Sequence, residues 1–108
     1  MIVVANRFDV DDEHSAAFVE QFKETSDHLT EHEGFRGFKV LTPEKADTHV
    51  SLTFWRSRDD FDAWVNSEDF AEAHEGDSLS DMMNAHPELE IHEVAFERES
   101  TEVIPTAE

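Results

Sequence analysis

Residues 48–74 read "THVSLTFWRSRDDFDAWVNSEDFAEAH" and pass from one secondary-structure pattern to another. Their first ten residues alternate in character, and this period of two predicts a β-strand. The two faces of that strand carry Val50, Leu52 and Phe54 on one side and Ser51, Thr53 and Trp55 on the other. Because a helical period follows directly, the segment predicts a fold that mixes strands and helices.

Two short helices are predicted after this strand. The first, in "SRDDFDAWV", turns Phe61, Trp64 and Val65 inward. Asn66 or Ser67 then caps a second helix, since both residue types are good N-caps. The second helix turns Phe70, Ala73 and His74 inward. Trp64 and His74, ten residues apart, therefore approach the interior from different helices.

The remaining segments complete a familiar order of elements. "IVVANRF" (residues 2–8) is a predicted strand with Val4, Asn6 and Phe8 on the face toward the helices. Residues 9–29 predict one amphipathic helix of about four turns. "HEGFRGFKVLTP" and "ELEIHEVAFER" predict the second and last strands. The order β-α-β-β-α-β indicates a ferredoxin-like α+β fold with an antiparallel sheet. We expect a single domain over residues 1–97, followed by a C-terminal tail over residues 98–108.

The sheet face away from the helices is expected to be partly apolar. Its predicted members are Val3, Ala5, Trp55, and either Ile91 with Ala95 or Val94 with Phe96. An open apolar sheet face is a liability unless another subunit covers it. We therefore expect a homodimer in which two sheets close face to face.

Charge excludes several classes of partner. The 108 residues contain 27 Asp and Glu against 8 Lys and Arg, which gives a net charge of −19. Phosphates of nucleic acid and anionic membrane surfaces would be repelled. The sequence has no apolar run long enough for a membrane span and no leader-like N-terminus, so we expect a cytoplasmic protein. Its acidity indicates a halophilic protein, in which high salt screens the repulsion among the surface charges.

Missing residue types narrow the chemistry. The chain has no Cys, no Tyr and three Gly, and it contains no dinucleotide or phosphate-binding loop. Redox work would therefore need external electrons. A haem iron could be bound only by His or Met, and Met82, Met83 and the seven His are the main candidates.

Each candidate residue also has a structural interpretation. An inward Asn6 usually bonds to backbone, an inward Trp64 is usually core, and an inward His74 is usually a satisfied core residue. The functional alternatives are a donor aimed at a ligand, a rigid wall against a flat ligand, and an iron ligand whose other nitrogen is held by Glu72, Glu75 or a carbonyl. His28 and His32 have the spacing of a helical metal pair, but a solvated helix end is the favoured interpretation.

Taken together, "ANRF", "EGFRGF" and "TFWRSRDDFDAWVNSEDFAEAH" resemble the haem-degrading monooxygenases (iron-regulated surface determinant type) of the antibiotic-biosynthesis-monooxygenase superfamily. The resemblance extends over about residues 1–75, and the last strand matches by topology. In that family an Asn on the first strand, a Trp, and a His ten residues after the Trp form the catalytic set. Asn6, Trp64 and His74 fill these positions.

The resemblance implies a dimeric α+β barrel that binds haem as both substrate and cofactor, with O₂ and an external reductase or small reductant. His74 would bind the haem iron, Asn6 would hydrogen-bond to the ligand on the opposite side, and Trp64 would press the macrocycle out of plane. The ring would open to release iron and a linear tetrapyrrole. Residues 75–90 match no family pattern: Leu79, Met82 and Met83 could cover the pocket, and His86 could compete for iron.

Other functions remain open on the same fold. A cofactor-free monooxygenase acting on a quinol or polyketide would use His74 as a base or structural residue. A haem carrier or sensor would bind haem without turnover, and a structural dimerisation module would bind neither. Propionate contacts are not assigned, since Arg7, Lys39 and Arg56 are weakly placed in the sequence.

Overall fold

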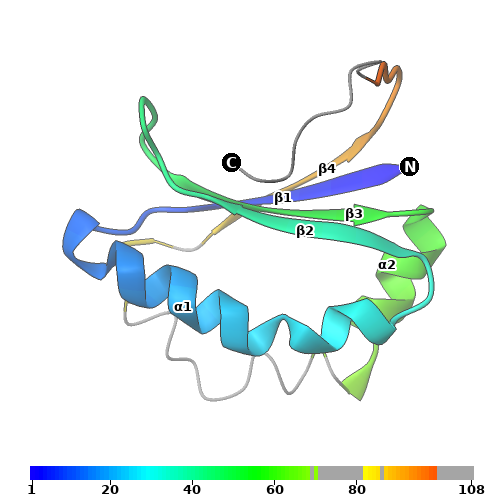
Figure 1. Ribbon diagram of the computed structural model, residues 1–108, viewed down its shortest axis with the longest axis horizontal. Helices are drawn as coiled ribbons and strands as arrows, with labels where there is room; N and C mark the ends of the chain where they lie inside the picture. Colours follow the sequence, from blue (N-terminus) through cyan, green and yellow to red (C-terminus); the bar gives the residue numbers. More distant parts are fainter. Residues whose placement is uncertain (69, 71–81, 86, 100–108) are drawn as a thin grey trace, which may run out of the picture.

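The computed structural model describes residues 1–68, 70, 82–85 and 87–99. A four-stranded antiparallel sheet in the order β2-β3-β1-β4 carries the helices on one face (Figure 1). The elements are β1 (Ile2–Phe8), η1 (Asp12–His14), α1 (Ser15–Thr25), η2 (Asp27–Glu31), β2 (Phe35–Leu41), β3 (His49–Trp55), α2 (Arg58–Val65) and β4 (Glu88–Glu93). This order and topology confirm the predicted ferredoxin-like α+β fold. Among these residues, no helix has the length and apolar composition of a membrane span.

The predicted helix over residues 9–29 is broken into three pieces. The central piece is α1, and 3₁₀ turns η1 and η2 flank it. At its end the Ser26 amide still bonds to the Phe22 carbonyl at 3.0 Å, but the Leu29 amide then reaches only back to Ser26, also at 3.0 Å. Ser and Asp side chains compete for backbone groups in this stretch and weaken helix continuation. The break matters because η2 carries His28 and Leu29 toward the interior.

The sheet register fixes which side chains face the helices. Asn6 lies opposite Ser51 on β3 and Leu89 on β4. Val4 and Phe8 are buried on the same face, 3% and 6% exposed, as predicted.

The predicted orientation of β3 was wrong. Trp55 lies opposite Ile2 and is fully buried against Val4 and Phe61, so it belongs to the helix-facing side with Ser51 and Thr53. A shift of one residue exchanges the two faces of a strand, and β3 carries Val50, Leu52 and Phe54 on one face but Trp55 on the other. On the helix-facing side of β3, the small polar residues Ser51 and Thr53 line a cavity.

The outer face therefore differs from the expected one. Ile91 pairs with Val4 and packs on the core, which excludes the alternative with Ile91 and Ala95 outside. Val94 and Phe96 lie beyond the end of β4. The residues that do share the outer face are Val3, Ala5, Val50, Leu52 and Phe54, with Arg7, Glu90 and His92 beside them.

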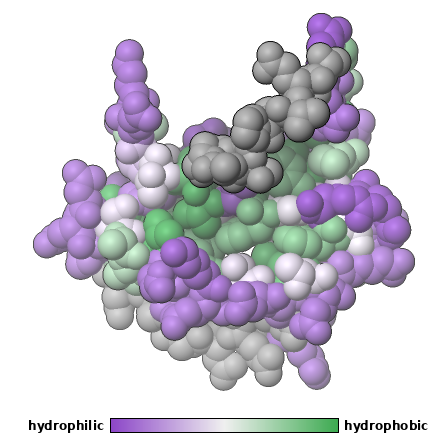
Figure 2. Space-filling model, viewed as in Figure 1, coloured by the Kyte–Doolittle hydropathy of each residue, from purple (hydrophilic) through white to green (hydrophobic). Residues whose placement is uncertain are grey.

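Two groups of apolar side chains join the helices to the sheet. One is built on Val4, Leu29, Trp55 and Phe61, and the other on Phe8, Val10 and Phe18. In the second, the rings of Phe8 and Phe18 meet edge to face at 5.1 Å. Figure 2 shows hydrophobic side chains between the sheet and α1, with hydrophilic ones over the outside of α1. The two groups lie at either end of this layer, and a cavity lies in the same layer.

Candidate ligand-binding cavity

A cavity of about 500 Å³ lies between the helices and the sheet. That volume falls within the roughly 300–1,000 Å³ of small-molecule sites. Aromatic and aliphatic side chains from β1, β2, β4, α1, η2 and α2 form most of its wall, and β3 contributes Ser51 and Thr53. The apolar lining residues include Val4, Phe8, Phe22, Leu29, Phe38, Phe61, Trp64, Phe70, Met83 and Ile91. The cavity therefore suits a largely apolar ligand with a few polar groups.

Asn6 lies in the middle of the sheet wall. The side chain is half-buried and lines the cavity beside Ser51. Within the part of the chain that is described, no residue hydrogen-bonds to its carboxamide. The structural interpretation was that the Asn6 side chain hydrogen-bonds to backbone groups, as buried amides usually do. No such bond is present among those residues, so that interpretation is wrong. A carboxamide offers two N–H donors and one acceptor to whatever enters.

Trp64 forms an aromatic wall of the cavity. Its ring stacks on Trp55 with centroids 5.6 Å apart and planes 28° apart, and it meets Phe70 edge to face at 4.8 Å. The indole Nε1–H donates to Nε2 of His28 at 3.0 Å. Trp64 is thus both part of the apolar core and a cavity surface, as the two sequence interpretations allowed.

His28 is a cavity residue that the sequence did not indicate. It is half-buried in η2 and lines the cavity, so the solvated helix end expected there was wrong. Its ring meets that of His32 nearly at right angles, with centroids 5.8 Å apart. No sequence signal distinguished it, because only the break between α1 and η2 turns position 28 toward Trp64.

His74 lies outside the described residues, as do Glu72, Ala73, Glu75, Leu79 and His86. The segment leading to His74 is described as far as Phe70. The Phe70 amide donates to the Ser67 hydroxyl at 3.3 Å, the bond expected of an N-cap. Of the two predicted caps, Asn66 and Ser67, Ser67 makes this bond. Of the two methionines expected to cover the pocket, Met83 lines the cavity and Met82 packs on the Phe8 group.

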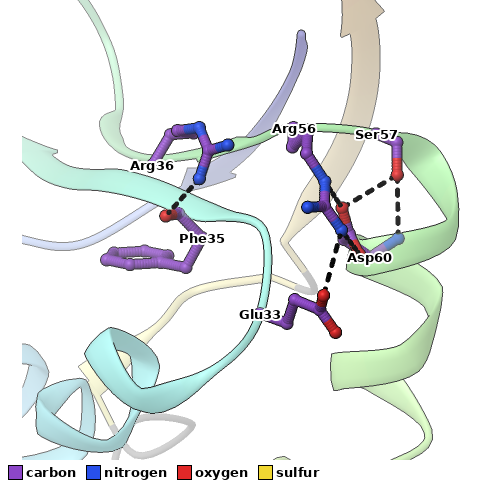
Figure 3. Close-up of polar contacts among 6 residues, drawn as sticks. All are labelled: Glu33, Phe35, Arg36, Arg56, Ser57 and Asp60. Carbon is purple, nitrogen blue, oxygen red and sulfur yellow. Dashed lines mark hydrogen bonds and ion pairs between the residues drawn. The ribbon is translucent and has the colours of Figure 1, made fainter.

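A polar corner of Glu33, Arg56, Ser57 and Asp60 lies at the start of α2 (Figure 3). The Arg56 guanidinium donates to both Asp60 carboxylate oxygens, at 2.8 and 3.0 Å, and the Ser57 hydroxyl caps the helix. The hydrogen bond from Arg56 is the main cause that lowers the pKa of Asp60, and the same pair raises the pKa of Arg56. Gly34 (φ +83°) passes so close that a Cβ there would collide with Asp60. The corner thus needs glycine at 34.

Charged groups near the cavity are few. Arg58 and Asp62 line it and pair with each other at 3.1 Å. Arg7, Lys39 and Arg56, the cations considered from the sequence, are not among the lining residues. Arg7 instead bonds to Glu90 on the outer face, and this bond is the main cause that lowers the pKa of Glu90. Arg58 is therefore the cation placed to meet a ligand's acidic group among the described residues.

Comparison with known proteins gives consistent matches. A profile of the family described as antibiotic biosynthesis monooxygenase matches residues 1–76. A haem oxygenase (staphylobilin-producing) of Staphylococcus saprophyticus is 38% identical over 81 residues, which cover 72% of this chain and 77% of that protein. A haem-degrading monooxygenase of Shouchella clausii is 31% identical over 101 residues, covering 91% and 94%. The haem degrader MhuD of Mycobacterium tuberculosis, solved with two haems in its active site, superposes with a TM-score of 0.77 at 25% identity, covering 92% of this chain and 100% of that chain.

Proposed function

Because the chain belongs to the antibiotic biosynthesis monooxygenase family, we propose that it is a haem-degrading monooxygenase. Haem is its substrate, bound in the cavity between helices and sheet. With O₂ and electrons from outside, the enzyme opens the porphyrin ring and releases iron and a linear tetrapyrrole. The observation that carries the proposal is the cavity itself, in which Asn6 and Trp64 both face one apolar space.

The cavity fits the chemical character of haem. A porphyrin is flat and largely apolar, and the walls here are aromatic on the Trp64 side and aliphatic at Val4 and Ile91. Its two propionates need a polar edge. At the wall formed by α1 and α2, Gln21 supplies an uncharged donor and Arg58, which pairs with Asp62, supplies a cation. This edge supports a binding mode in which the carboxylates lie near the helices.

Asn6 is proposed as the donor on the sheet side. Its carboxamide needs no rearrangement to donate, since no described residue occupies it. A hydrogen-bond donor in an apolar site stabilises developing negative charge more strongly than the same donor does in water. Asn6 would in this way direct oxygen chemistry toward one edge of the ring.

Trp64 is proposed to shape the bound ring. Its indole is held between Trp55 and His28, with Phe70 at its edge. A wall packed on several sides cannot yield easily when a planar ligand presses on it. The ligand therefore has to adapt, and an out-of-plane porphyrin changes the electronic structure of the iron.

His74 is proposed to supply the imidazole that binds the iron. The support is its position ten residues after Trp64, together with the Ser67 cap that starts the intervening segment. A chain without Cys or Tyr has few other ligands to offer. The same composition supports an external reductase or small reductant as electron source. We further propose a homodimer through the outer sheet face and a cytoplasmic location.

A haem titration followed by a reductant tests the function. Hemin added to the apo protein in molar KCl should give a sharp, saturable Soret band, and ascorbate with O₂ should then bleach it and release chelatable iron. Catalase is present throughout, because free peroxide destroys haem without an enzyme. His74→Ala should weaken binding and abolish bleaching, whereas His14→Ala, in η1 and not among the cavity-lining residues, should behave as wild type.

The outcomes separate the alternatives. A Soret band that never bleaches would identify a haem carrier or sensor and contradict the proposal. No Soret shift at all would contradict it as well, and would favour a cofactor-free monooxygenase. Unchanged binding in His74→Ala would leave the enzyme class intact but would overturn the assignment of the iron ligand.

A further inference from the structure

We propose that His28 is a positioning residue that fixes the plane of the Trp64 indole in the cavity. The inference rests on the proposed function, because the orientation of Trp64 matters for turnover only if a planar substrate lies against it. The hydrogen bond itself can be tested in the protein without haem. The two parts can therefore fail separately.

The contact joins two segments far apart in the chain. His28 lies in η2 and Trp64 at the end of α2, 36 residues later, and both line the cavity. The Trp64 Nε1–H donates to His28 Nε2 at 3.0 Å. The two rings are also nearly parallel, with an interplanar angle of 23° and centroids 6.1 Å apart. The imidazole thus bonds to the Nε1 edge of the indole, and its plane is nearly parallel to the indole plane.

This bond uses the whole hydrogen-bonding capacity of the indole. Tryptophan has one donor and no acceptor, so His28 provides the partner that a partly buried Nε1–H requires. His28 must present a lone pair on Nε2, and its proton is then on Nδ1. A lysine, arginine or doubly protonated histidine at position 28 could not accept this bond. The structure therefore assigns one tautomer to His28.

Packing alone does not hold Trp64 in this way. Trp55, Phe61 and Phe70 contact the indole through apolar surface, which constrains rotation about the Cβ–Cγ bond less than a directional hydrogen bond at Nε1 does. The bond to His28 defines where the Nε1 edge points. Removing it leaves the apolar contacts in place and frees the ring to tilt toward the cavity.

The experiment compares His28→Leu with His28→Gln. Leu has a similar bulk but no acceptor, whereas the Gln carboxamide reaches about as far as Nε2 and can accept. In ¹⁵N-labelled apo protein in molar KCl, the two Trp give two indole signals, and Trp64→Phe identifies which belongs to Trp64. Wild type should show a through-hydrogen-bond nitrogen–nitrogen coupling between Trp64 Nε1 and the His28 ring.

In His28→Leu the Trp64 indole signal should shift upfield and exchange faster with solvent, while the Trp55 signal stays in place. His28→Gln should restore protection from exchange. His14→Gln, in η1 and not among the cavity-lining residues, should change neither signal. Absence of the coupling in wild type, or a Trp64 signal that His28→Leu leaves unmoved, would overturn the proposal even if one variant failed to fold.

A second measurement connects the bond to turnover. His28→Leu should bind hemin within about threefold of wild type yet bleach it roughly tenfold more slowly, because small misplacement of a positioning group slows chemistry more than binding. His28→Gln should recover most of the rate. Equal bleaching rates in His28→Leu and wild type would overturn the role in turnover. If wild type itself binds no hemin, the proposed function fails while the spectroscopic result still decides the bond.

Discussion

At the scale of single residues, the cavity depends on one polar side chain placed among apolar ones. Asn6 occupies a strand position where Val or Ile would pack better, and no described residue bonds to it. The side chain lines the cavity, so its two N–H donors and its carbonyl acceptor are open to whatever enters. We expect a bound ligand to complete these hydrogen bonds.

Substitution of this residue should separate binding from chemistry. We expect Asn6→Ala to bind hemin nearly as wild type does and to bleach it slower by a factor on the order of 10², the usual cost of removing one preorganised donor. Single-turnover bleaching after saturation with hemin measures the rate directly. Asn66→Ala, an exposed Asn at the end of α2, is the control. A normal rate in Asn6→Ala would show that the carboxamide plays no part in the reaction.

At the scale of elements, α2 is short and depends on its first turn. Eight residues make a marginal helix in isolation, so caps and tertiary contacts must supply its stability. The Arg56–Asp60 pair and the Ser57 cap act on that turn, and Gly34 leaves room for them. Since Trp64 follows Asp60 by about one helical turn, the corner at the helix start also affects the shape of the cavity.

Asp60→Asn should lower the thermal unfolding temperature at neutral pH. The pKa of Asp60 is lowered in the folded protein, so its carboxylate stabilises the fold above the unfolded-state pKa, and this contribution is lost as the pH falls through the folded-state value. The difference between wild type and variant should therefore shrink on acidification. Calorimetry between pH 7 and pH 3 measures it.

Asp59→Asn is the matched control for this experiment. Asp59 belongs to the same first turn and has the same favourable position near the helix N-terminus, but its side chain is exposed. If the two variants lost stability equally, the helix dipole would explain the effect and the ion pair with Arg56 would not.

At the scale of the whole molecule, two properties follow from the surface. The first is self-repulsion from a net charge of −19. Raising KCl from 0.1 M to 1 M shortens the screening length from about 10 Å to about 3 Å, which should raise the unfolding temperature. Sorbitol at equal osmolality, which does not screen charge, should raise it less. Equal effects of the two solutes would contradict an electrostatic origin.

The second property is the apolar outer face of the sheet. With Val50, Leu52 and Phe54 outside rather than inside, this face is more apolar than the sequence suggested, which strengthens the expectation of a homodimer. Sedimentation equilibrium in molar KCl should give twice the chain mass of 12.4 kDa for wild type and the single mass for Phe54→Asp. Ala17→Asp, which adds the same charge on exposed α1 surface, should stay dimeric. A monomeric wild type would refute the dimer.

The sequence by itself determined the order of strands and helices, the fold class, and the inward positions of Asn6 and Trp64. Hydrophobic period is a local property, and it marks the core-facing side of α2 and the Ile2, Val4 and Phe8 side of β1. Only the tertiary structure decided the face of β3, because Val50, Leu52 and Phe54 favour one side and Trp55 the other, and only the pairing with β1 distinguishes them. The contact between His28 and Trp64 likewise depends on a helix break and on packing across 36 residues, which local periodicity cannot predict.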